Sequence, residues 1–466
     1  MLRVAAPPPP AWDTLLPPQA RRLSAELAAI DAYLDDDRFI TPWQPHFSVR
    51  LGRPSVPIQT LLRLLYLKHR YQLGYETLCR EVSDSISWRR FCRIGLDQPV
   101  PHPTTLVKLV GRAGAATIEQ LNAALLAKLA GDKLLRCHKL RIDTTVVSAN
   151  VAYPTDLGLL ARAVGKLVAT AKRVQAAGGA TRTRTRIRDR RRAARRRSRE
   201  VARAMRARTG DAKQVVFAVT RQVAALAEAQ LADARRVVAN ARRALRTAGA
   251  AGRCMALADE LQTTIARTRR LLDQASTRLA GGMPDGASRL VSLHDPDARP
   301  IRKGRIGHPV EFGYKAQVAD NPDGIVVDHT VMVGNPPDAP LLVPAVKRVI
   351  ARTGKAPRAV TADRGYGEAR VDQDLAERGV TRIAIPRRGR AGPARQAVER
   401  GRGFRRLVKW RTGCEGRISQ LKHRFGWDRT RMDGIQGARI WCGYGVFAHN
   451  LVKVSGMLEA KQRKTA

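Results

Sequence analysis

The first part of the chain is patterned mainly for helices. From Pro57 onward, apolar residues recur every three or four positions, with basic side chains on the opposite face. Three short helices, the last carrying Arg89 and Arg90, are typical of a helix-turn-helix-like module. After Pro103 we expect Thr104 or Thr105 to cap a longer helix. The second and third short helices are expected at 75–82 and 88–91, and the longer helix at 104–129. Two later segments, 215–246 and 256–279, also have helical spacing.

Strand-like patterning starts at His138. Residues 138–147 alternate between apolar and polar positions and are rich in β-branched side chains, which predicts a strand. Much later, Asn321–Gly324 is a turn signal between two alternating runs, 311–318 and 325–333, so a hairpin is expected. The elements that follow are a helix at 340–352, a strand at 358–362, a helix at 367–378, a strand at 381–386 and a helix at 404–425.

This order of elements predicts an α/β protein. An antiparallel hairpin beside parallel strands, with helices covering the sheet, is the ribonuclease-H-like arrangement. We expect such a core to be interrupted after its first strand by a long helical insertion, and to follow an all-α N-terminal domain. The expected boundaries are 1–50 for a Pro-rich segment, 51–130 for the DNA-binding helical domain, 135–156 and 291–455 for the core, 157–290 for the Arg-rich insertion and 456–466 for a basic tail.

Charge narrows the class of partner. The 466 residues include 85 Lys and Arg against 40 Asp and Glu, a net charge of +45. With 44 % hydrophobic residues the chain can build a core, so this surplus favours a polyanion such as nucleic acid over a small neutral substrate. Only 5 % of the residues are aromatic, which argues against binding mainly by stacking on single-stranded bases.

The insertion holds the densest positive charge. Within Arg182–Arg208, 14 of 27 residues are Arg, and the acids are Asp189 and Glu200. Such a block repels itself unless phosphates neutralise it, so we expect it to be poorly ordered or bound to DNA. The alternative is a solvated helical spacer. Segments 215–246 and 256–279 are expected to form an antiparallel coiled pair.

Several other classes of protein are disfavoured. No run of 18 or more apolar residues occurs, so we expect no membrane span. The first residues lack the apolar core of a secretory signal. The six cysteines form no Cys-x-x-Cys pair, which indicates a reducing compartment and no zinc site. A phosphate-binding P-loop and a nucleophile elbow are also missing. We therefore expect a cytoplasmic, nucleoid-associated protein.

Three carboxylates are the candidates for chemistry. Asp143 lies in the first strand, Asp363 directly follows the strand 358–362, and Glu415 lies on the last predicted helix. If the first and fourth strands are neighbours, these side chains converge. Oxygen-only ligands suit Mg²⁺ or Mn²⁺, and two such ions about 3.5–4 Å apart support in-line phosphoryl displacement. An Asp at a strand end is also a common turn or cap residue. Competing acids are Asp328, Glu368 and Asp372.

The motifs around these carboxylates resemble those of the DDE transposases of bacterial insertion sequences. They are Asp143-Thr144-Thr145, Ala362-Asp363-Arg364-Gly365-Tyr366 and Arg411-x3-Glu415-x6-Lys422. The last is similar to the signature Tyr-x2-Arg-x3-Glu-x6-Lys, with Val408 at the tyrosine position. Segments 313–315 and 335–338 look most like the ISNCY group, and 39–114 resembles the helical DNA-binding domain of related transposases.

The resemblance implies metal-dependent DNA cleavage at terminal inverted repeats, followed by transfer of the 3′-hydroxyl into target DNA. By position, Asp143, Asp363 and Glu415 become ligands of Mg²⁺ or Mn²⁺, with two ions expected. Arg411 and Lys422 would contact DNA phosphates near the cut. The partners would be double-stranded DNA, both element ends and target, and further copies of the chain in a homodimer or higher oligomer.

Two rival functions stay open at this point. A metal-dependent nuclease or resolvase would cut without joining. A non-catalytic DNA-binding protein derived from a transposase would have no need for three carboxylates at matching positions.

Overall fold

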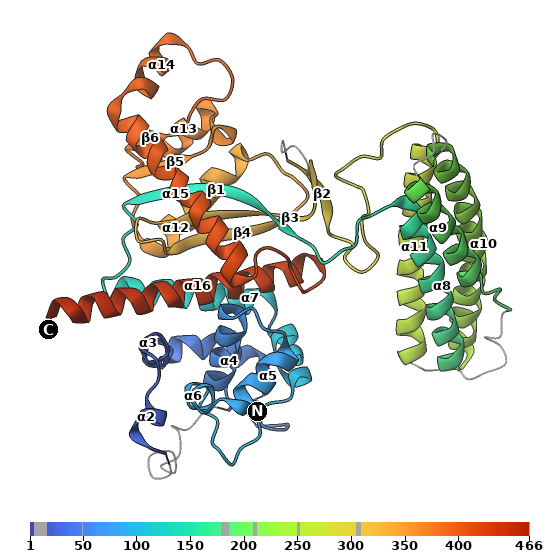
Figure 1. The fold of residues 1–466 in the computed structure, drawn as a ribbon, viewed down its shortest axis with the longest axis horizontal. Helices are drawn as coiled ribbons and strands as arrows, with labels where there is room; N and C mark the ends of the chain where they lie inside the picture. Colours follow the sequence, from blue (N-terminus) through green and yellow to red (C-terminus); the bar gives the residue numbers. More distant parts are fainter. Residues whose placement is uncertain are drawn as a thin grey trace. The chain divides into compact units, whose positions relative to one another are not determined.

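The computed structural model resolves two compact units, Met1–Ala149 with Tyr314–Ala466, and Asn150–Gly313, each described here by itself (Figure 1). The described residues are 1–3, 16–48, 50–178, 186–207, 212–248, 252–303 and 309–465. Part of the predicted Arg-rich block, 182–185 and 208, lies outside them, as does Pro7–Pro10.

The first unit begins with helices packed around a buried central one. They are α2 (Pro18–Arg21), α3 (Ala25–Tyr33), α4 (Ile58–Arg70), α5 (Tyr75–Asp84), α6 (Ile86–Phe91) and α7 (Pro103–Gly131), with two short 3₁₀ turns, Asp37–Phe39 and Thr41–His46. Helix α4 even buries Arg63, whose Nε donates to Asp31 at 2.6 Å. The prediction for the start of α7 is wrong in detail. His102 caps it, because its Nδ1 accepts from the Thr104 backbone N–H.

The sheet of this unit is mixed. Its strands are β1 (Lys139–Ser148), β3 (Val310–Asp320), β4 (Val326–Val333), β5 (Ala359–Ala362) and β6 (Arg382–Ala384). They run in the order β3–β1–β5–β6, with β4 antiparallel to β3, and β1, β5 and β6 are parallel. A short β2 (Arg299–Arg302) pairs with the first residues of β3. A hairpin beside parallel strands is consistent with the predicted ribonuclease-H-like core.

Helices cover this sheet. The set comprises α12 (Ala339–Thr353), α13 (Ala369–Ala376), α14 (Pro393–Arg400), α15 (Arg402–Phe425) and α16 (Gly434–Thr465). Helix α15 packs on β1, β5 and β6, whereas α12 and α16 pack on β4. Figure 1 shows α16 passing between the sheet and the N-terminal helices, and it contacts α3, α4 and α7 as well as β4.

Helix α16 was not predicted from the sequence, and it continues through the expected basic tail, 456–466, as far as Thr465. Its residues 441–450 are all buried, so the segment has no polar face from which a helical period could be recognised. Asn450 anchors it by bonding the backbone N–H and C=O of Val326, each at 2.9 Å. The last helix is thereby fixed to the start of β4.

The second unit is a helical bundle. It consists of α8 (Asp156–Gly178), α9 (Arg191–Ala207), α10 (Ala212–Ala248) and α11 (Gly252–Leu279). Helices α8, α10 and α11 pack on one another around a core of Leu, Val and Ala, and α9 lies on α8 and α10. The expected pair of long helices is therefore part of a larger bundle.

In the described part of the chain, one helix segment, 213–244, is long and apolar enough to cross a membrane. That test is weak, since its apolar face packs against the rest of this bundle.

Candidate active site

Two of the three predicted carboxylates lie side by side. Strands β1 and β5 are parallel neighbours, and Ile142 is in register with Ala362. Asp143 and Asp363 are the residues that directly follow this pair. Neighbouring strands lie about 4.7–4.9 Å apart, so both aspartates reach the same point, midway along β1 and at the carboxyl end of β5. The expectation that these strands are neighbours is confirmed.

Backbone hydrogen bonds orient both aspartates. Oδ1 of Asp143 accepts from the Thr144 N–H at 2.8 Å. Oδ1 of Asp363 accepts from the Gly365 N–H at 2.9 Å, so Asp363 caps the short 3₁₀ helix Arg364–Tyr366. In both residues these bonds engage Oδ1, and a cap role is compatible with chemistry at the other oxygen.

Glu415 joins this pair through an arginine. Helix α15 carries Arg411 and Glu415 one turn apart, on the same face. Nη1 of Arg411 lies 2.9 Å from Oδ2 of Asp143, and Nη2 lies 3.0 Å from Oε1 of Glu415. Among the described residues, no three Asp, Glu, His or Cys side chains are gathered closely enough to hold a metal ion. Arg411 is the cation between Asp143 and Glu415 in this structure.

The chemistry of these groups nevertheless fits a divalent cation. Burial raises the pKa of Asp143 to about 6, and the charge of Asp363 acts in the same direction. The pKa of Asp363 is also raised, first by burial and then by the nearby charge of Asp338. Desolvated carboxylates side by side need positive charge to remain ionised. Oxygen ligands of this type suit Mg²⁺ or Mn²⁺.

A fourth carboxylate, Asp338, belongs to the same cluster and was not singled out from the sequence. Its Oδ1 lies 2.7 Å from Nζ of Lys315 and accepts from Oγ1 of Thr144 at 3.0 Å. Asp338 therefore ties the start of α12 to β1 and β3 beside the two aspartates. The only signal in the sequence was its place in the segment 335–338.

A buried ion cluster fixes α15 against the sheet. Asp320, at the end of β3, is fully buried and accepts from Nε and Nη2 of Arg141 at 2.7 and 2.8 Å. Arg417 on α15 donates to the same carboxylate at 3.2 Å. Arg141 also donates to the Trp410 carbonyl of α15 at 3.1 Å. The two arginines lie two residues from Asp143 and Glu415, so this cluster sets how those carboxylates face each other.

Two glycines make room for the two guanidinium groups. A Cβ at Gly413 would collide with Arg141, and a Cβ at Gly324 would collide with Arg417. Gly324 also has a φ of +79°, which disfavours other residues. The close approach of α15 to β1 thus depends on the missing side chain at Gly413.

Comparison with known proteins now adds the family. Residues 13–112 match a transposase domain, DUF772, and residues 288–451 match the transposase DDE domain, so the two matches together cover more than half of the chain. The chain therefore carries a transposase DDE domain and a second transposase domain ahead of it. Enzymes with this domain are metal-dependent phosphoryltransferases and generally use divalent metal ions.

The transposase is also similar to an uncharacterized protein of Rhizobium meliloti, ORF8 in the nfe locus. The two are 30 % identical over 131 residues, which are 26 % of this chain and 62 % of the relative. The chain therefore spans less than two thirds of that relative's length. No solved structure matches the chain.

The matched DDE domain of the transposase contains Asp363 and Glu415 but begins after Asp143. Between β1 and β3 lie the helices α8 to α11, which separate Asp143 from the rest of the core along the chain. The parallel pairing of β1 with β5 brings Asp143 close to the other two carboxylates.

The competing acids of the transposase are engaged elsewhere. Asp328 is buried between Arg348 and Arg352, at 2.7 and 2.6 Å. The other two also form ion pairs: Glu368 with Arg388 at the surface, and the half-buried Asp372 with Arg395. These pairings indicate roles in holding the fold.

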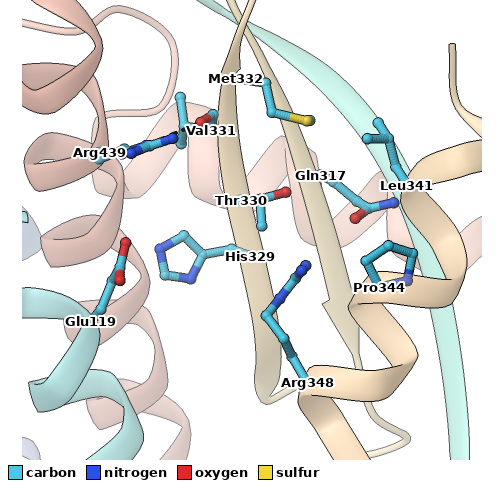
Figure 2. Close-up of a pocket in the computed structure, with 10 residues that line it drawn as sticks. All are labelled: Glu119, Gln317, His329, Thr330, Val331, Met332, Leu341, Pro344, Arg348 and Arg439. Carbon is cyan, nitrogen blue, oxygen red and sulfur yellow. Dashed lines mark hydrogen bonds between the residues drawn. The ribbon is translucent and has the colours of Figure 1, made fainter. Parts of the chain in front are cut away.

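A pocket of about 280 Å³ also lies away from the predicted trio. Figure 2 shows His329 and Thr330 on β4, Glu119 and Arg439 on one side of this strand, and Arg348 of α12 on the other. None of Asp143, Asp363 and Glu415 lines it. The carboxylates of the transposase are thus separate from this pocket.

The predicted DNA contacts are untested by this geometry. Arg89 donates to the carbonyls of Ser83, Gly95 and Gln98 at 3.1, 2.8 and 3.0 Å, which indicates that it stabilises the loop after α6. Arg90 is half-buried beside it. Lys422 lies half-buried on α15, three turns after Arg411. Contact of these residues with DNA stays a prediction.

Proposed function

We propose that this transposase binds the ends of a bacterial insertion sequence, cleaves DNA there and transfers the 3′-hydroxyl into target DNA. The observation that carries the proposal is the register of β1 and β5, which sets Asp143 beside Asp363. The contact of Arg411 with both Asp143 and Glu415 supports the third member. Asp143, Asp363 and Glu415 are then the metal ligands.

Bound at these carboxylates, two Mg²⁺ or Mn²⁺ ions supply activation of the attacking hydroxyl and stabilisation of the leaving oxygen. The chain itself orients Asp143 and Asp363 through the Thr144 and Gly365 N–H groups. In this proposal Arg411 and Lys422 on α15 bind DNA phosphates, and the support for Arg411 is that a guanidinium that neutralises carboxylates also binds phosphate well.

Further features of the proposal rest on charge and resemblance. A net charge of +45 supports double-stranded DNA as partner and a cytoplasmic, nucleoid-associated location. We include Arg89 and Arg90 of α6 among the DNA contacts. Because two element ends must be held for paired cutting, the active form is a homodimer or higher oligomer. Within the family, segments 313–315 and 335–338 favour the ISNCY group.

The two rival functions make different predictions about the same carboxylates. A nuclease needs the trio but yields no joined product. A non-catalytic DNA-binding protein gains nothing from two desolvated aspartates side by side, which destabilise each other when ionised. The carboxylate cluster therefore favours an enzyme, and a joined product separates transposase from nuclease.

The test uses purified full-length protein and a labelled duplex that carries the DNA end flanking the coding sequence. Products formed with Mg²⁺ or Mn²⁺ are resolved on a denaturing gel. Asp363→Asn should abolish cutting and spare binding. The matched control is Asp374→Asn on α13, a residue that pairs with Arg378 and should leave cutting unchanged.

Metal-dependent cutting at the end, lost in Asp363→Asn, together with slower joined products, is the expected result. Cutting without any joined product would favour the nuclease. Tight end binding with no cutting under either metal would overturn the catalytic proposal.

A further inference from the structure

Helix α9 of the bundle, together with the residues just before it, presents a surface of arginines to solvent. Arg186, Arg188, Arg192, Arg195, Arg196 and Arg199 are all exposed, and no carboxylate of the described residues pairs with any of them. We call these six residues the α9 arginine surface. On the helix itself, Arg192 and Arg196, and Arg195 and Arg199, lie one turn apart, so like charges face each other.

Helix α11 of the bundle carries acidic residues that pair with arginines of its neighbours. Like α9, it packs on α8 and α10. Glu260 binds Arg173 of α8 at 3.1 Å, and Asp259 binds Arg242 of α10 at 3.1 Å. Arg173 and Arg242 thus have acidic partners on α11, whereas the members of the α9 arginine surface face like charges.

An external polyanion removes this repulsion. We propose that the α9 arginine surface binds the phosphate backbone of duplex DNA without sequence preference. The inference rests on the proposed function, since DNA is the polyanion that a transposase handles. Over Arg192–Arg199 the helix advances about 10 Å, and a duplex carries one charge per about 1.7 Å of its axis, so several phosphates lie within reach.

Other anionic partners fit this surface less well. Helix α9 contains no aromatic residue, so it offers no platform on which single-stranded bases could stack. Its apolar side is already used, because Ala194 is fully buried in the bundle core and Ile187 and Val201 pack against it. An amphipathic helix that binds a lipid surface needs a free apolar face. Duplex DNA therefore remains as the occupant.

The test neutralises four of these arginines in the full-length chain, as Arg192→Gln, Arg195→Gln, Arg196→Gln and Arg199→Gln. The matched control removes the same charge from other exposed positions of the bundle, as Arg173→Gln, Arg242→Gln, Arg253→Gln and Arg269→Gln. Because all eight side chains are exposed, both variants should fold, which circular dichroism and thermal melting check. Binding of random-sequence duplex is measured over a series of salt concentrations, without divalent metal.

The α9 variant should show a slope of log affinity against log salt that is shallower by about 3 to 4, since each phosphate contact contributes about 0.9. The control should change the slope by less than about 1. An unchanged slope in the α9 variant, or equal changes in both, overturns the proposal. So does a larger loss of affinity for single strands or for vesicles of anionic lipid than for duplex.

This readout is separate from catalysis. Asp363→Asn should keep the wild-type salt slope, since the carboxylate is not part of the α9 arginine surface. If the wild-type protein fails to cut element ends but α9 still carries the salt dependence, the transposition proposal fails and this one stands.

Discussion

Arginines are prominent in two regions of the protein, but their environments differ. One region is the contact between α15 and the sheet, which we call the seam and which contains Arg141, Arg417 and Asp320. The other is the α9 arginine surface. At the seam, Arg141 and Arg417 are at least nine-tenths buried and share the carboxylate of Asp320. The six residues of the α9 arginine surface are exposed and lack acidic partners among the described residues, unlike Arg191 and Arg197 of the same helix. A buried charge that is paired fixes geometry, whereas an exposed charge that is unpaired is available to a polyanion.

Removing the carboxylate that Arg141 and Arg417 share should have the largest effect on the seam. Asp320→Asn leaves Arg141 and Arg417 buried without a counter-charge, which should lower the free energy of unfolding by about 3–5 kcal/mol. Denaturant unfolding of the full chain measures this. The control Asp374→Asn, which weakens a half-buried contact of 3.9 Å with Arg378, should change it by less than about 1 kcal/mol. Equal losses in both variants would show that the seam is not special.

Gly413→Ala disturbs the seam without changing any charge. The added Cβ collides with Arg141, so α15 must shift and Glu415 moves relative to Asp143. A misplacement of about 1 Å can lower a rate about 100-fold, and we expect a loss of that order in end cleavage. Stability should also fall, because the forced shift outweighs the about 0.5–1 kcal/mol by which Ala favours a helix over Gly.

Gly416→Ala on the same helix is the matched control. A Cβ there meets nothing within 4 Å, so cleavage should be unchanged and stability slightly higher. If Gly413→Ala cleaves DNA as well as Gly416→Ala, the close approach of α15 is not needed for activity.

A smaller effect on stability is expected from the buried imidazole of His449, beside the seam. Nε2 of His449 donates to the Gly324 carbonyl at 3.1 Å, and burial together with the charges of Arg417 and Lys453 lowers the pKa of His449 to about 3. Between about pH 6.5 and pH 3 the unfolded chain therefore binds a proton that the folded chain does not. The stability contributed by neutral His449 is present above pH 6.5 and falls by about 1.4 kcal/mol per pH unit below it.

Unfolding measured at pH 6.5 and at one unit below tests this. His449→Gln should reduce the loss between the two pH values by about 1 kcal/mol, whatever its effect on stability at pH 6.5. The same loss in wild type and variant would place the pH sensitivity in other groups.

The sequence predicted local features of the catalytic core well. The strands that end at Asp363 and carry Asp143 follow from β-branched alternation, and the turn Asn321–Gly324 identified the hairpin. The order of elements then implied that β1 and β5 are neighbours. These features depend on residues close together in the sequence, which is what patterning records.

Features that depend on distant residues escaped prediction. Asp338 and Asp320 look like ordinary acids until the fold sets them beside Lys315 and Arg141. Helix α16 was missed because its central residues are buried on every side. The position of α9 in the bundle was not predicted, because arginine is its most frequent residue and only a few apolar residues attach it to α8 and α10.

The central claim is that carboxylates from both sides of the insertion form one metal-dependent site. Asp143→Asn tests it most directly, because Asp143 alone of the three lies before the insertion and outside the matched DDE domain. Cleavage of a labelled element end is followed over a range of Mg²⁺ and Mn²⁺ concentrations, with end binding measured in parallel without metal. The account predicts unchanged binding and no cleavage at any metal concentration. Cleavage within about twofold of the wild-type rate would contradict it.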